Sequence, residues 1–179
     1  MMHRVRILMA LVLLTVVSGA FFAQAQETCA GGFAPSFRLE GQVTTPNTYD
    51  LQALRQLPQT RVRTVFINNE VEEGTFTGVL LWDLIEAAGV VLDPAHRNDL
   101  IRKSVLITGS DCYEAVFSLG ELIPRLGGSQ PVIVAVKRDG ELLGPDRGMA
   151  WIINTGDKFG DRNVFNVARI QVLSPEAPQ

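Results

Sequence analysis

Short runs in which apolar and polar residues alternate, or in which β-branched residues dominate, recur along the chain from residue 36 onward. Such runs are typical of β-strands. The expected strands cover residues 36–43, 61–67, 76–79, 104–108, 113–117, 131–137, 141–143, 151–153 and 164–172. Turn residues stand at 68–69, at 109–111 and at Asp139-Gly140, and the last two predict hairpins at 104–117 and 131–143.

Helical spacing of apolar residues occurs in only three short segments. The first covers residues 51–57, with Thr48 or Asp50 as the N-cap, and the second covers residues 81–88, which Gly89 follows as a C′ glycine. The third begins at residue 118 with a capping box and ends at Pro124. The predicted fold is therefore α+β, mostly β in mixed sheets with about three short helices.

The first 25 residues have a different pattern from the rest of the chain. A basic start with Arg4 and Arg6 precedes an apolar run at residues 7–17, and Ala23-Gln24-Ala25 has the small-x-small spacing of a signal peptidase site. We expect a signal peptide at 1–25 and a periplasmic or secreted single domain at 26–179, with its core at about 36–173. An uncleaved N-terminal anchor is the alternative. No later apolar run is long enough to span a membrane.

Charge and histidine content exclude several function classes. The formal net charge is −3, so we expect no nucleic-acid partner, because such surfaces are basic. His96 is the only histidine after residue 25, in a polar, proline-containing stretch, and we interpret it as an exposed loop residue. A site with several histidines is excluded, and no metal ligand is predicted.

The two cysteines of the chain are Cys29 and Cys112. Export implies an oxidising compartment, so a disulfide between them is the first interpretation. The alternative is that Cys112 is a lone thiol near a site, which would require a lowered thiol pKa.

Polar groups that could bind a ligand concentrate in two regions. The first contains Asp111 and Tyr113, and a plain hairpin turn is its alternative interpretation. The second covers residues 144–148 and 156–163, where Arg147, Lys158 and Arg162 could neutralise an anion beside glycines. Because Asp146, Asp157 and Asp161 stand beside these cations, the alternative is a pair of solvated loops.

Four segments in order, at residues 76–89, 107–118, 131–135 and 148–164, resemble the sulfite-oxidase-type molybdopterin-binding domain in a short, stand-alone exported form. The resemblance spans about Phe37 to Val172. It implies the α+β sulfite oxidase fold and binding of a molybdenum–pterin cofactor. Gly160, Arg162 and Asn163 match the family loop that cradles the pterin phosphate.

The chain also departs from that family pattern. Catalytic members carry a molybdenum-binding cysteine in the segment that corresponds to residues 67–73, and no cysteine stands there. Phe165 stands where a lysine is usual, so half of the anion clamp is missing. The start Arg4-Val5-Arg6 contains no adjacent arginine pair, which indicates export of an unfolded chain without a preloaded cofactor.

Two functional hypotheses follow from this pattern. In the first, the domain holds a molybdopterin-type cofactor near Arg147, Lys158 and Arg162, with weak or no chemistry of its own. In the second, it is a cofactor-free module that binds a small anionic ligand or an exported protein partner. The resemblance makes molybdopterin a candidate, but we expect none to be bound, and no catalytic residue is assigned. Thiol chemistry at Cys112 is a third hypothesis.

Overall fold

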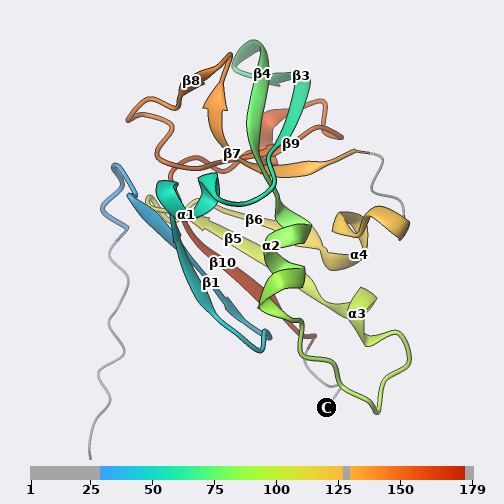
Figure 1. Cartoon of the computed structure of the whole chain (residues 1–179). Helices are drawn as coiled ribbons and strands as arrows, with labels where there is room; N and C mark the ends of the chain where they lie inside the picture. The colour runs from blue at the N-terminus through green and yellow to red at the C-terminus, as the bar shows by residue number, and fades with distance from the viewer. Residues whose placement is uncertain (1–28, 127–129, 176–179) are drawn as a thin grey trace, which may run out of the picture.

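The computed structural model describes residues 29–126 and 130–175, so the leader predicted at 1–25 lies outside the described residues. Two sheets make up the molecule, one above the other in Figure 1. The first has the strand order β2-β1-β10-β5-β6, and the second has the order β3-β4-β7-β8, with β9 also paired to β7. The first sheet consists of β1 (Ser36–Gly41), β2 (Asn47–Asp50), β5 (Ser104–Gly109), β6 (Glu114–Ser118) and β10 (Val167–Leu173).

The first sheet is mixed, as predicted, because β1 runs parallel to β10 whereas the other pairs are antiparallel. Its main cover is helix α2 (Leu81–Ala88), which lies in front of this sheet in Figure 1 and buries one apolar face. Gly89 ends the helix with φ 72°, a backbone conformation that favours glycine. The resulting core holds most of the buried apolar side chains of the protein.

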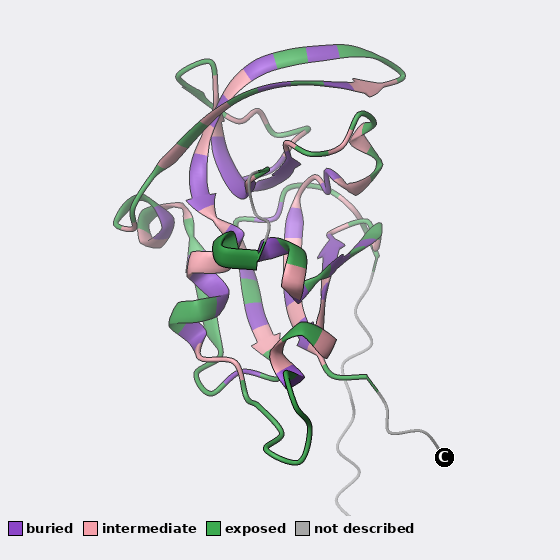
Figure 2. Cartoon of the chain, turned by 90° about the vertical axis from the view of Figure 1, so that its right-hand side faces the viewer, coloured by how far each residue is buried: buried purple, intermediate pink, exposed green. Residues whose placement is uncertain are grey.

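The second sheet has its own small aromatic core. It consists of β3 (Thr60–Asn68), β4 (Glu70–Leu80), β7 (Val132–Arg138), β8 (Glu141–Leu142) and β9 (Trp151–Asn154). The ring of Trp151 contacts those of Phe66 and Phe76 edge to face, at centroid distances of 5.9 and 5.2 Å. Figure 2 shows the long β3–β4 hairpin arching across the top of the molecule, and from Glu72 to Gly78 buried residues of β4 alternate with exposed or intermediate ones. Edge-to-face contacts of this kind stabilise beyond the area that they bury.

The remaining helices are short. Helix α1 (Leu51–Arg55) begins at Asp50, whose carboxylate accepts a hydrogen bond from the Ala53 amide. Helix α4 (Leu119–Leu122) begins with the predicted capping box and is followed by the 3-10 turn η1 (Pro124–Leu126). A second 3-10 turn, η2 (Gly160–Arg162), precedes β10.

Several elements differ from the sequence prediction. Strand β2 was not predicted, because residues 48 and 50 were interpreted only as candidate caps of the following helix; it pairs with β1. Helix α3 (Asp99–Arg102) was not predicted, because it has no apolar periodicity; buried Asp99 holds it through an ion pair of 2.9 Å with Lys103. Strand β4 begins at Glu70 and not at Phe76, because register with β3 extends through the acidic stretch to Asn68. The number of α-helices among the described residues is therefore four.

Cys29 and Cys112 form a disulfide with a Cα–Cα distance of 5.2 Å. This confirms the predicted pairing and excludes a lone thiol at Cys112, because these are the only cysteines in the chain. The bond ties the segment before β1 to the turn between β5 and β6. His96 lies in a loop, as predicted, with its Nδ1 2.9 Å from the Asp93 carboxylate.

Within 29–126 and 130–175 there is no helix of the length and apolarity needed to cross a membrane. The same ranges contain no cluster of three or more histidine, cysteine, aspartate or glutamate residues placed to hold a metal ion.

Candidate functional site

A cavity of about 280 Å³ lies where the two sheets approach each other. One end of β3 contributes Asn68, and the turn between β5 and β6 contributes Asp111 and Tyr113, on either side of the disulfide cysteine. The segment from η2 toward β10 completes the wall with Gly160, Asp161, Asn163 and Phe165. Four of the residues selected from sequence, Asp111, Tyr113, Gly160 and Asn163, thus lie around one cavity.

Direct contacts hold the walls of this cavity together. The phenol of Tyr113 donates a hydrogen bond to the carbonyl of Asp161, which joins the β5–β6 turn to η2. The Ile67 amide donates to the carbonyl of Lys158 at 3.0 Å, which joins the same segment to β3. A Cβ on Gly160 would come within 3.0 Å of the Phe66 ring, so this close approach favours glycine.

Asn163 forms the buried base of the site, with 3% of its surface exposed. Its amide donates to the Gly160 carbonyl at 2.8 Å, and its own carbonyl accepts from the Trp151 indole at 3.2 Å. Its Oδ1 accepts from the Asn154 amide at 2.8 Å, which fixes the orientation of the side chain. The remaining polar atom, Nδ2, is buried without a hydrogen-bond partner. Buried donors are normally paired, so this atom stands out among the polar groups of the residues that line the cavity.

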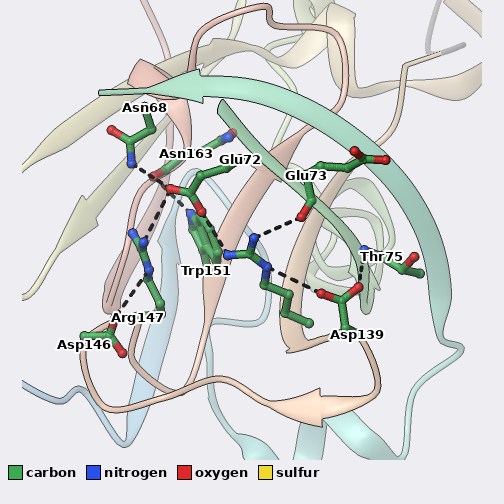
Figure 3. A network of polar contacts seen from close by, with 10 residues as sticks. Asn68, Glu72, Glu73, Thr75, Asp139, Asp146, Arg147, Trp151 and Asn163 are labelled. Atoms are coloured by element: carbon green, nitrogen blue, oxygen red, sulfur yellow. Dashed lines mark hydrogen bonds and ion pairs between the residues drawn. The ribbon is translucent and has the colours of Figure 1, made fainter. Parts of the chain in front are cut away.

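A buried carboxylate lies behind the cavity wall. The side chain of Glu72 is 7% exposed, and its oxygens lie 3.0 Å from Arg138 and 3.4 Å from Arg147 (Figure 3). Asn68 donates to the same carboxylate at 3.2 Å. The guanidinium of Arg147 also lies 4.2 Å from the centroid of the Phe165 ring. Phe165 lines the cavity, whereas Arg147 does not. The charge of Arg147 pairs with Glu72 instead.

Sequence reasoning missed Glu72, although a signal was present. Phe76 faces inward in β4, and a period of two carried back from it places Gly74 and Glu72 on the same face. The run of acidic residues at 70–73 obscured that alternation.

Arg162 lies at a second cavity, of about 250 Å³, which includes Glu121 and Asp157 in its wall. Its guanidinium contacts both oxygens of Asp157 at 2.8 Å and one oxygen of Glu121 at 3.0 Å. The hydrogen bond with Arg162 lowers the pKa of Asp157 below its ordinary value, and the same bond raises the pKa of Arg162. Both charges are therefore strongly held in their ionised forms.

The three cations selected from sequence do not meet at one place. Arg147 pairs with Glu72, Arg162 pairs with Asp157, and Lys158 is exposed beside the Phe159 ring, with Nζ 5.5 Å from its centroid. The 280 Å³ cavity is lined instead by two carboxylates, two side-chain amides and two aromatic rings. Such a wall can accept hydrogen bonds through Asp111 and Asp161 and can donate one through Asn163.

Comparisons with known proteins place this geometry in context. The model of the family described as "Oxidoreductase molybdopterin binding domain" matches residues 34–179. Among solved structures, the sulfane dehydrogenase SoxCD from Paracoccus pantotrophus matches with a TM-score of 0.65 at 18% sequence identity. The match covers 78% of this chain and 38% of that one, and at this identity it shows a shared fold. A comparison with curated proteins gives no significant match.

Proposed function

The chain belongs to the oxidoreductase molybdopterin binding domain family and has its sulfite oxidase-like fold, and from that premise we propose that it is an exported binding module without molybdenum chemistry of its own. Its ligand is a small molecule that occupies the 280 Å³ cavity between the two sheets.

The disulfide is the single observation that carries this proposal. Molybdenum in sulfite-oxidase-type sites requires a cysteine thiolate, and both cysteines of this chain are consumed in the bond between Cys29 and Cys112. The oxygen and amide donors of the cavity wall do not substitute for a soft thiolate ligand. The residues present therefore do not fit a molybdenum centre of that type.

The distribution of charge argues against an anionic pterin in the same cavity. A pterin phosphate needs cationic partners, but Arg147 is engaged by Glu72, and Arg162 is engaged by Asp157 and Glu121. The cavity wall itself carries Asp111 and Asp161, which would repel a phosphate. The residues of the cavity wall therefore do not fit a pterin phosphate either.

Export is supported by the sequence of the leader and by the disulfide. The segment 1–25 has the charge, apolar run and cleavage pattern of a signal peptide, without an adjacent arginine pair. Disulfides persist in oxidising compartments, which agrees with a periplasmic or secreted protein. A protein exported unfolded would reach that compartment without a preloaded cofactor.

The decisive experiment measures molybdenum and released pterin in folded protein purified from its native compartment. The proposal predicts that both are far below one equivalent per chain. Near-stoichiometric pterin would overturn it and favour the molybdopterin-holding alternative, for which the unpartnered amide of Asn163 is the supporting observation. In that case Arg162→Ala should abolish pterin retention, and the control variant Lys137→Ala, at a half-buried cation of β7 that lines neither cavity, should not.

A further inference from the structure

The lining of the 280 Å³ cavity also indicates which class of ligand fits it. Resting on the function proposed above, we infer that the cavity binds a small polyhydroxylated ligand without negative charge, the size of one sugar ring. The wall supports this ligand class by its hydrogen-bonding groups, its aromatic surface and its charge, and the cavity does so by its volume.

Asn163 requires an acceptor. Its Nδ2 is buried without a partner, while its other polar atoms are all engaged within the protein. Leaving such a donor unmet is unfavourable, so a ligand oxygen that comes within reach of Nδ2 would gain the lost hydrogen bond. A simple ammonium ion cannot meet this need, because it has donors and no acceptor.

Asp111 and Asp161 require donors. Among the described residues neither carboxylate forms an ion pair, and one oxygen of Asp111 accepts from the Tyr113 amide at 3.0 Å. Both residues are exposed and line the cavity, where ligand hydroxyl groups can donate to their carboxylates. Hydroxyl groups both donate and accept, so one ligand with several of them satisfies Asp111, Asp161 and Asn163 together.

Two rings and a small volume complete the match. Tyr113 and Phe165 supply apolar surface on the same wall, and such surface packs against the C–H faces of a sugar ring. The volume of about 280 Å³ is just below the range of roughly 300–1,000 Å³ that drug-sized ligands occupy. Among the residues that the structure describes, no cation lines the cavity, so a phosphorylated ligand of the same shape would be repelled by the two carboxylates.

The test is titration of ¹⁵N-labelled mature protein with three kinds of probe. These are the neutral hexoses glucose, galactose and mannose, the amino sugar glucosamine, and glucose 6-phosphate. We expect at least one unphosphorylated probe to shift the side-chain amide resonances of Asn163 in a saturable manner, with glucose 6-phosphate binding more weakly.

Substitutions at the wall give the matched controls. Asp161→Asn should weaken binding by about tenfold, since the negative charge that strengthens the hydrogen bond from the ligand is lost. Asp111→Asn should do the same while keeping the oxygen that accepts from Tyr113. Glu86→Gln removes one exposed charge on α2, away from the cavity, and should leave affinity unchanged.

Three results would overturn the inference. They are no saturable shift with any unphosphorylated probe, equal affinity of both aspartate variants and the parent, or tighter binding of glucose 6-phosphate than of glucose. Pterin analysis of the same preparation distinguishes failure of the proposed function from failure of the proposed ligand class. Bound pterin defeats the proposed function, whereas absence of both pterin and sugar binding defeats only the ligand class.

Discussion

The disulfide between Cys29 and Cys112 should contribute a large part of the stability of this domain. The two cysteines are 83 residues apart, so the bond closes a long loop in the unfolded chain. The chain-entropy relation gives about 4.5 kcal/mol at 25 °C for a loop of this length. Since domains of this kind are stable by about 5–15 kcal/mol, removing the bond should cost a third or more of the total.

Urea unfolding of the parent and of the double variant Cys29→Ala/Cys112→Ala measures this contribution. With a typical slope of about 2 kcal/mol/M, the midpoint should fall by roughly 2 M. Ser110→Ala provides a control at the same junction, because it removes only the hydrogen bond to the Gly32 carbonyl. That variant should lose about 1 kcal/mol or less.

Two results would refute the reasoning. A loss below about 1.5 kcal/mol in the double variant would mean that loop closure does not govern this bond's contribution. Two alkylatable thiols in the unreduced exported protein would mean that Cys29 and Cys112 are not paired at all.

Three further predictions concern packing and charge. Gly78→Ala should lower the free energy of unfolding, measured in urea, by about 2–3 kcal/mol, because the new Cβ would lie 2.0 Å from a carbonyl oxygen of β7. As a control, Gly120→Ala meets only ordinary contacts and should lower it by less than about 1 kcal/mol. Equal losses in the two variants would contradict this prediction. Glu72→Gln should lower the free energy of unfolding by about 2 kcal/mol in the same assay. The loss is smaller than for a fully buried ion pair, because Arg138 and Arg147 remain about a third exposed. An unchanged midpoint would show that the contacts of Glu72 with the two arginines do not stabilise the fold. The pKa of Asp157 is lowered in the folded state by Arg162, so its contribution is present above the unfolded pKa of about 3.9 and is lost as the pH falls below it. Asp157→Asn should therefore flatten the acid limb of a stability–pH curve, and an unchanged limb would contradict that assignment.

Local chemistry in the sequence determined much of the fold. The turn at Asp139-Gly140, the helix that ends at Gly89 and the capping box that begins at Ser118 all act within a few residues, so each was predicted from its own segment. The disulfide was predicted from the compartment and the number of cysteines. The α+β class followed from the periodicity, and the ordered segments identified the family.

Long-range pairing decided the candidate site. Asn68, Asp111 and Asn163 belong to three separate parts of the chain, and only the two sheets bring them to one cavity. The sequence likewise did not predict the full length of β4. Its acidic start pairs with β3 in a register that the local pattern of residues does not indicate.

The grouping of charges was also a tertiary result. Sequence proximity suggested that Arg147 and Arg162 share one anion site. Arg147 is instead engaged by Glu72, which is distant in the sequence, and Arg162 by the nearby Asp157 and the distant Glu121. Composition and spacing determine which charges a chain carries. Which charges meet depends on burial, because a carboxylate removed from water requires a paired cation, and the fold selects the cation that can reach it.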